Sequence, residues 1–233
     1  TPAVRELIVL ILPATAAAGV YQISQLFYAY FSSRLGEGAL TMLSYADRLN
    51  QLPLSIIGTA LGVAILPSIS QAIARSENDR AAEVQAHAFD LSMLLTLPAT
   101  LALAVAAGPI IGALYQGGEY SIDSARTTAS ILAILVTGLP AYVLVKVLTP
   151  AFYARKDVKT PVTIAMTVLA LSIPANFLLI PRMGIFSLAT VTSAGAWVNF
   201  ALLFGVLYAR GHFRMPRWLV GRVFRQLVAA LAM

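Results

Sequence analysis

The sequence predicts an all-α integral membrane protein, a bundle of six transmembrane helices followed by the start of a further helix. Composition is the first observation, because 59% of the residues are hydrophobic and only 11% are charged, against roughly 25% charge in an ordinary soluble domain. The second observation is that six long stretches contain no Asp, Glu, Lys or Arg. About 20 apolar residues are enough to cross a bilayer core, so each stretch is a candidate span.

The six predicted spans are residues 7–30, 52–73, 91–114, 127–145, 160–181 and 183–209. They are apolar on nearly all sides, whereas a surface helix of a soluble protein carries polar residues on its outer face with a period of 3.6. The strands of a membrane β-barrel would be short and would alternate in hydrophobicity. Each stretch is therefore expected to be a helix that contacts lipid or other helices.

The joints between the spans are short. Residues 75–90 are charged and rich in Ala, which suits an interfacial helix, and Ser121 or Asp123 can cap the fourth span. The joint at 181–184 leaves room only for an antiparallel helical pair. No linker or soluble domain interrupts the series, so the spans are expected to pack as one bundle.

We expect residues 1–212 to form this six-helix bundle. Residues 213–233 are predicted to be a basic interfacial segment and the start of a truncated further helix, which begins at Gln226. Because the chain starts at Thr1 and ends inside an apolar run, we also expect it to be a piece of a longer protein.

The distribution of charge predicts the orientation. If the spans alternate in direction, most of the 16 Lys and Arg residues fall on one side, namely Arg5, Arg75, Arg80, Arg155, Lys156, Lys159, Arg210, Arg214, Arg217, Arg222 and Arg225. The positive-inside rule places that side in the cytoplasm. Acidic lipids at the membrane surface attract such residues, so the net charge of +6 is explained without a nucleic-acid partner.

Enzymatic and metal chemistry have few candidate residues here. The chain has no Cys, and its two His residues, His87 and His212, lie outside the predicted spans. A zinc site needs several His, Cys or carboxylate ligands, and a serine-type triad needs a His beside its nucleophile. We therefore predict no enzyme, no metal site and no cofactor. Gly58 and Gly62 indicate close helix packing rather than a phosphate-binding loop.

A polar segment, residues 45–53, runs without a break into the second span. Arg48 lies only about 6 Å before that span at 1.5 Å per residue, so its guanidinium can reach lipid headgroups or a polar cavity in the bundle. Ser44, Arg48 and Gln51 are expected to share one helical face, whereas Asp47 points about 100° away. An Arg suits a pyrophosphate because its planar fork binds two oxygens at once. The residues alone leave both the anchoring and the cavity interpretation open.

Four ordered motifs resemble the MurJ (MviN) family of lipid II flippases, within the multidrug, oligosaccharidyl-lipid and polysaccharide exporter superfamily. They are YADRLNQLPLSIIGTALGVAILPSIS at 45–70, QISQ at 22–25, the stretch 108–120 around YQGGEY, and KVLTPAFYARKDVKTP at 146–161. The resemblance covers nearly the whole chain. It implies that the six spans are helices seven to twelve of a fourteen-helix, two-lobe transporter, so that this chain is the second lobe.

The resemblance also implies a function and its site. The expected activity is translocation of lipid II, linked to undecaprenyl pyrophosphate, across the bacterial cytoplasmic (inner) membrane by alternating access. Arg48 stands where the family has its cavity arginine and is expected to contact the pyrophosphate, with Gln51 and Ser44 beside it. Lys146, Arg155 and Lys159 are candidates for an entry gate or headgroup contact, although a snorkelling side chain for Lys146 and a positive-inside anchor for 155–159 are the simpler uses of these charges. The expected partners are the glycolipid, membrane lipids and the missing first lobe.

Some relatives bind sodium with carboxylates and amides from the first, fifth and sixth spans of this lobe. This chain has no carboxylate in those spans. Side-chain oxygens are available there from Ser172, Asn176, Thr190 and Thr192, but packing and hydrogen bonding to helix carbonyls are the expected uses. The sequence therefore gives sodium coupling no carboxylate ligand in these spans, and it leaves the membrane potential or another gradient open as the energy source.

Two other classes of function stay open from the sequence. One is an exporter of another polyprenyl-linked glycan or of drugs in the same superfamily, although a drug exporter is expected to place acids inside the lobe. The other is a membrane scaffold that does not transport, for which an Arg near a cavity has no use.

Overall fold

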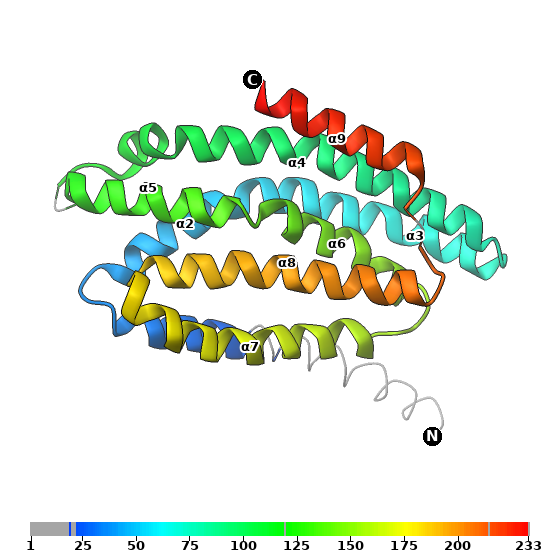
Figure 1. Ribbon diagram of the computed structural model, residues 1–233, viewed down its shortest axis with the longest axis horizontal. Coiled ribbons are helices and arrows are strands. Elements are labelled where there is room, and N and C mark those ends of the chain that lie inside the picture. Colours follow the sequence, from blue (N-terminus) through cyan, green and yellow to red (C-terminus); the bar gives the residue numbers. More distant parts are fainter. Residues whose placement is uncertain (1–18, 20–21, 119, 214, 233) are drawn as a thin grey trace.

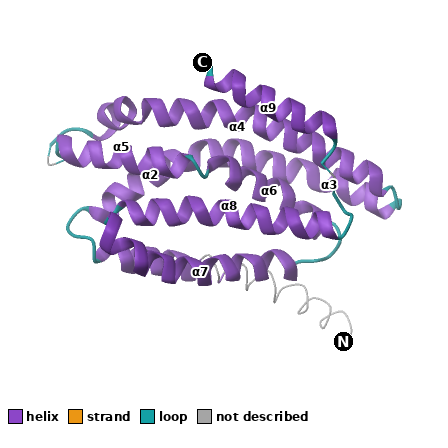
Figure 2. Cartoon of the chain, viewed as in Figure 1, coloured by secondary structure: helices purple, strands orange, loops and turns teal. Residues whose placement is uncertain are grey.

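The computed structural model describes residues 19, 22–118, 120–213 and 215–232, and this part of the chain contains helices and no strand (Figure 2). After a first described helix at residues 22–33, the elements are α2 (Ala39–Pro53), the π-helix η1 (Leu54–Thr59), α3 (Ala60–Ala74), α4 (Asn78–Tyr115), α5 (Ile122–Val136), α6 (Leu139–Tyr153), α7 (Lys159–Met183), α8 (Phe186–Ala209) and α9 (Arg217–Leu231). Figure 1 shows the long helices packed along one common direction. The predicted all-α class is confirmed.

Four helical segments are long and apolar enough to cross a bilayer: Ala39–Ala74, Asn78–Tyr115, Lys159–Met183 and Phe186–Ala209. The pair α5 and α6 makes a fifth when it counts as one span, which is bent by 41°. These segments contain the second to fifth predicted spans, and the last segment covers the sixth, 183–209, from Phe186 onward. The first predicted span, 7–30, lies mostly outside the described residues, so the number six stays a prediction.

The sequence predicts an interfacial helix at residues 75–90. The structure shows no separate helix there. After a turn at Ser76, whose φ is +61°, the chain enters α4, which runs for 38 residues. At 1.5 Å per residue this helix is about 57 Å long, nearly twice the roughly 30 Å of a bilayer core. One helix can therefore hold both a charged start outside the core and an apolar span within it.

Pro53 marks the junction between α2 and η1. A proline has no N–H to donate to the carbonyl four residues earlier, and its ring crowds that carbonyl. The next six residues, Leu54–Thr59, have π-helical hydrogen bonding before α3 resumes the α-helix. The polar segment 45–53 thus continues into the second span without a break, as predicted. π-helical turns inside α-helices are frequent at functional sites.

Two of the predicted helix ends are confirmed. Ser121 Oγ accepts a hydrogen bond from the Ser124 backbone N–H at 3.1 Å, so Ser121 is the N-cap of α5. Only Gly184, at a φ of +53°, and Ile185 separate α7 from α8. The two helices lie side by side and antiparallel (Figure 1), as the short joint requires.

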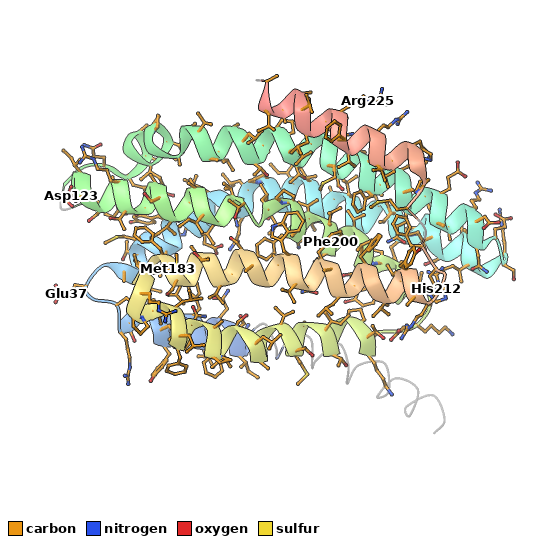
Figure 3. All side chains as sticks on the ribbon, in the orientation of Figure 1. Glu37, Asp123, Met183, Phe200, His212 and Arg225 are labelled. Atoms are coloured by element: carbon orange, nitrogen blue, oxygen red, sulfur yellow. The ribbon has the colours of Figure 1, made fainter. Side chains whose placement is uncertain are left out.

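The helix ends gather at two opposite ends of the bundle. Glu37, Asp123 and Met183 lie at one end and His212 at the other (Figure 3). The connection from α3 to α4 and the start of α7 lie at the same end as His212 (Figure 1). The alternation that the predicted orientation requires is therefore present from α2 to α8.

The buried core has two main clusters. One joins α2, the end of α4, α5 and the start of α8, with Leu43 and Ile131 fully buried. The other joins the first half of α4, α6 and the end of α8, with Leu148 and Phe213 fully buried. Together the clusters fix α2, α6 and α8, which border the candidate site.

The last helix differs from the prediction in where it begins. α9 starts at Arg217 rather than at Gln226. Its inner face packs on α4 through the fully buried Leu219. Asp90 of α4 accepts hydrogen bonds from Arg222 Nη1 at 2.9 Å and from Gln226 Nε2 at 2.8 Å. The helix starts early because its basic residues alternate with apolar ones at a helical period, and Arg222 has an acidic partner, Asp90, on α4.

Candidate functional site

A cavity of about 680 Å³ lies inside the bundle. Its walls come mainly from the helix at 22–33, from α2 and η1, and from α6, α7 and α8. Apolar, hydroxyl and amide side chains make up most of the lining. Asp47 and Lys146 are the charged residues in the lining that the structure describes. The site is therefore mainly neutral, with one charge of each sign.

The sequence predicts that Ser44, Arg48 and Gln51 share one face of α2, but the structure places Gln51 on the face of Asp47. Gln51 lines the cavity together with Asp47, and Gln51 Nε2 donates a hydrogen bond to Asp47 Oδ2. Ser44 is half-buried and Arg48 is exposed, and neither lines the cavity. Residues four apart lie about 40° apart around a helix and residues three apart about 60°. Gln51 can therefore face the same side as Asp47, and packing decides that it does.

The Arg48 guanidinium has no hydrogen-bond or ion-pair partner among the residues that the structure describes. It projects from the exposed side of α2, next to the cavity-lining residues Asp47 and Asn50 in the sequence. An unpaired cation on this face is free to contact a ligand or another part of the protein.

Lys146, in the middle of α6, lines the cavity. Its Nζ donates a hydrogen bond to Thr59 Oγ1, at the end of η1, at 3.3 Å. A Cβ on Gly58 would lie 2.9 Å from Lys146 Cδ, and a Cβ on Gly62 would lie 2.8 Å from the Lys146 carbonyl oxygen. The predicted use of this glycine pair, close helix packing, is confirmed.

Several hydroxyl groups around the cavity are bonded to helix carbonyls. Tyr142 Oη donates to the Thr192 carbonyl at 3.0 Å, which ties α6 to α8. Ser172 and Thr190 each donate to the carbonyl four residues earlier in their own helix, at 2.8 and 2.9 Å. The predicted back-bonding is confirmed for these two residues.

Three asparagines in the cavity lining, Asn50, Asn176 and Asn199, each have a buried side-chain oxygen with no hydrogen-bond partner among the described residues. They come from α2, α7 and α8. Asn176 Nδ2 donates to the Ser172 carbonyl at 2.9 Å, so only its oxygen lacks a partner. The sequence predicts a packing role for Asn176 and no role for Asn50 or Asn199. The signal in the sequence was an amide inside or beside an apolar span, where polar groups are costly.

Arg155 and Lys159 do not line the cavity, so they are separate from Lys146. They flank Asp157 in the connection between α6 and α7. Asp157 Oδ2 pairs with Arg210 Nη1 at 2.5 Å, and Asp157 Oδ1 accepts from the Thr160 backbone N–H at 3.0 Å. Burial raises the pKa of Asp157, but hydrogen bonds from Thr160 and Arg210 outweigh burial and hold the pKa below its ordinary value. This connection is thus an ion-paired joint between α7 and the end of α8.

Comparisons with known proteins match this architecture. Residues 1–233 match the family described as Lipid II flippase MurJ. The chain is 38% identical over its full length to a probable lipid II flippase MurJ of Rhizobium meliloti, of which it covers 43%. It is 36% identical to a lipid II flippase MurJ of Burkholderia cenocepacia, with 98% of this chain and 44% of that protein covered.

Solved structures show the same fold. A lipid II flippase MurJ in an inward closed conformation superposes with a TM-score of 0.83 at 21% identity, covering 98% of this chain and 47% of that one. A MOP superfamily transporter from Pyrococcus furiosus superposes with a TM-score of 0.73 at 17% identity, covering 96% of this chain and 52% of that one. The chain spans less than half the length of the curated relatives. Because the family match extends over every residue, the chain belongs to the lipid II flippase MurJ family.

Proposed function

We propose that this chain is the second lobe of a transporter that moves lipid II from the cytoplasmic to the periplasmic leaflet by alternating access. The observation that carries the proposal is the family match over residues 1–233. The relatives that it resembles carry the name lipid II flippase, and the chain covers 43% and 44% of two of them. The first lobe is then the chain's obligatory partner. In this proposal residues 1–212 hold six spans, and 213–233 lead into the next helix.

The setting of this function is the membrane. Four helical segments, or five with the bent pair, are long and apolar enough to span a bilayer. As a member of this family, the chain is a multi-pass protein of the bacterial inner membrane. The activity is transport rather than catalysis, so no reacting group is required of the site.

Arg48 is the residue proposed to contact the pyrophosphate. Arg48 is exposed on α2 and has no partner among the described residues, which supports this role, because the face that it occupies is available to the rest of the protein and to a ligand. A guanidinium held near a low-dielectric surface binds phosphate oxygens through two parallel hydrogen bonds. Ser44, on the same helix, is proposed to assist it. Gln51, which lines the cavity and donates to Asp47 Oδ2, is proposed to contact the substrate from the cavity.

The remaining predicted contacts divide into two groups. Lys146 lines the interior cavity, so its proposed role moves from an entry gate to the ligand cavity. Arg155 and Lys159 lie beside the Asp157 joint and outside the cavity, and for them an anionic headgroup at the membrane surface is the proposed contact.

Complementation of a bacterium depleted of its lipid II flippase tests the proposal. We expect the full-length protein to restore growth. Exporters of other polyprenyl-linked glycans and non-transporting scaffolds should both fail, so failure of an expressed, membrane-inserted protein would contradict the lipid II assignment.

A further inference from the structure

A contact between three tyrosines ties α2 to the connection between α4 and α5. Tyr45 lies on α2, Tyr115 is the last residue of α4, and Tyr120 lies in the connection itself, at the end of the bundle that Asp123 marks in Figure 3. The Tyr45 ring stacks on the Tyr115 ring, with centroids 4.1 Å apart and ring planes 6° from parallel. The Tyr120 ring meets the Tyr45 ring edge-on, with centroids 5.5 Å apart. Tyr45 is therefore the centre of one contact, the tyrosine clasp, between three parts of the chain.

The connection that carries Tyr120 is itself fixed. Tyr120 Oη shares a hydrogen bond with Thr128 Oγ1, and Thr128 is fully buried in α5. The Tyr120 backbone N–H donates to the Gly117 carbonyl at 3.1 Å. Gly117 and Gly118 have φ values of +154° and +57°, which residues with a side chain rarely adopt. The YQGGEY motif thus builds a compact turn that presents Tyr115 and Tyr120 to α2.

The backbone at either end of α2 does little to fix this helix. α2 begins after Gly36 and Gly38, whose φ values are +106° and +79°, and no side chain among the described residues caps its first turn. It ends at Pro53, where the π-helix η1 begins. The hydrogen bonds of η1 close a wider turn than those of an α-helix, so the regular ladder of α3 does not continue into α2.

The side chains of α2 therefore decide its position. Leu43, Ala46 and Leu49 are buried in the cluster that α2 shares with α5. Apolar contacts of this kind are non-directional, whereas stacked and edge-to-face rings prefer defined orientations. The cluster thus holds α2 against α5, and the tyrosine clasp adds the directional contact that fixes its rotation. Arg48 follows Tyr45 by three residues, about 4.5 Å along the helix axis.

The rotation of α2 decides which of two opposite charges meets a ligand. Arg48 is on the exposed side of α2, and Asp47 lines the cavity. Successive residues of an α-helix point about 100° apart. A phosphate attracts the guanidinium and is repelled by the carboxylate, so the proposed pyrophosphate contact depends on the orientation of this helix.

We infer that Tyr45 is a positioning residue for Arg48, because the tyrosine clasp holds α2 in the rotation that presents the Arg48 guanidinium. Tyr45 acts through its neighbours and needs no contact with the substrate. The task of Arg48 rests on the proposed function, whereas the effect of the clasp on the position of α2 does not. The two parts are therefore tested separately.

Transport of fluorescent lipid II by the full-length protein in proteoliposomes tests the positioning of Arg48. Each aromatic pair of this kind changes an equilibrium constant by roughly two- to twelvefold, and Tyr45→Leu removes two pairs. This variant should therefore slow transport by about fivefold or more. Tyr45→Phe keeps both ring contacts and should transport like the wild type. Tyr115→Leu removes the stacked ring from the side of α4, and it should slow transport as well.

Two comparisons separate positioning from a general loss of packing. Because Tyr45 acts through Arg48, the double variant Tyr45→Leu with Arg48→Ala should transport no more slowly than Arg48→Ala alone. Tyr30→Leu is the matched control. The Tyr30 ring contacts the Phe31 ring at 5.6 Å in the helix at 22–33, so this variant also loses a ring contact but should transport like the wild type.

The position of α2 can be measured without any substrate. Spin labels are placed at Leu52 on α2 and Leu178 on α7, which are 58% and 72% exposed, in the full-length protein with any other cysteine replaced. The distance distribution between the labels, measured by pulsed electron resonance, should be narrow on the wild-type background. It should broaden or shift with Tyr45→Leu and stay unchanged with Tyr45→Phe and Tyr30→Leu.

Three results would overturn the inference. The first is an unchanged label distance in Tyr45→Leu, which would mean that the clasp does not fix α2. The second is transport by Tyr45→Leu at the wild-type rate when Arg48→Ala is slow. The third is a double variant whose two losses multiply, which would mean that Tyr45 does not act through Arg48. A wild type that does not transport would instead contradict the lipid II assignment, and the label distances would still decide whether the clasp positions α2.

Discussion

Gly62→Ala should separate two tightly packed helices. A Cβ at this position would lie 2.8 Å from the carbonyl oxygen of Lys146 in α6. That oxygen belongs to the backbone, so the contact can be relieved only if α3 and α6 move apart by roughly half an ångström. A gap of this size already removes about a quarter of the dispersion energy between the atoms that face each other across it. Overpacking of this kind costs about 1–3 kcal/mol.

Two matched variants determine whether the contact is the cause. Gly205→Ala in α8 meets nothing within 4 Å, and Gly58→Ala meets the flexible Lys146 Cδ at 2.9 Å. Replacing Gly by Ala in a helix gains about 1 kcal/mol in propensity. We therefore expect Gly205→Ala to be neutral or stabilising, and Gly62→Ala to lie about 1–3 kcal/mol below it. Gly58→Ala should retain stability but displace the Lys146 side chain from Thr59.

The assay is thermal unfolding of the three full-length variants in detergent, followed by tryptophan fluorescence, under identical lipid and salt conditions. Equal melting temperatures for Gly62→Ala and Gly205→Ala would refute the close approach of α3 to α6. Such a result would also mean that the close contact of Gly58 and Gly62 with α6 does not set the position of Lys146 at the cavity.

Three further predictions concern the joints of the bundle. Asp157, whose pKa is held low in the folded protein, contributes stability above the pKa of the unfolded carboxyl, near 3.9, and this contribution is lost as the pH falls through the folded value. The stability advantage of the wild type over Asp157→Asn is expected to be about 1 kcal/mol or less for so exposed an ion pair. In thermal unfolding it should be full at pH 7 and should be lost as the pH falls below about 4. An advantage that grows with acid would contradict this. Asp90→Ala should destabilise the protein by about 1.5–3 kcal/mol. A double-mutant cycle with Arg222→Ala should show coupling between the two residues. Strict additivity of the two changes would mean that the 2.9 Å ion pair contributes nothing to stability. Lys156→Gly should raise the melting temperature, because a φ of +59° costs a non-glycine residue about 1–2 kcal/mol. A lower melting temperature would show that the contacts of the Lys156 side chain stabilise the protein by more than the backbone strain destabilises it.

The features that could be predicted from the sequence are those set by the bilayer as a solvent or by neighbouring residues in the chain. Long apolar runs determine where helices cross a bilayer. The spans of the structure contain the predicted runs from 52–73 to 160–181 and cover the run 183–209 from Phe186 onward. Local chemistry also predicted the Ser121 cap and the tight joint at 181–184, because both depend on neighbouring residues only.

The features that could not be predicted depend on tertiary packing. Helical geometry alone allows Gln51 to share a face with either Asp47 or Arg48, and the packing of the bundle places it at the cavity with Asp47. The position of Lys146 depends on Gly58 and Gly62 of another helix. The sequence marks each cavity asparagine as an amide inside or beside an apolar span, but only the packing of the bundle determines whether its oxygen has a partner among the described residues.

The central claim is that this lobe brings Arg48 to the pyrophosphate of a lipid that is being moved across the membrane. Its most direct test is transport of fluorescent lipid II by the full-length protein in proteoliposomes, with the label in the outer leaflet quenched chemically over time. The wild type should transport, and Arg48→Ala should slow transport by at least tenfold. Arg182→Ala, which changes an exposed arginine in the last turn of α7, should transport like the wild type. Transport by Arg48→Ala at the rate of the wild type would contradict a role of Arg48 at the pyrophosphate.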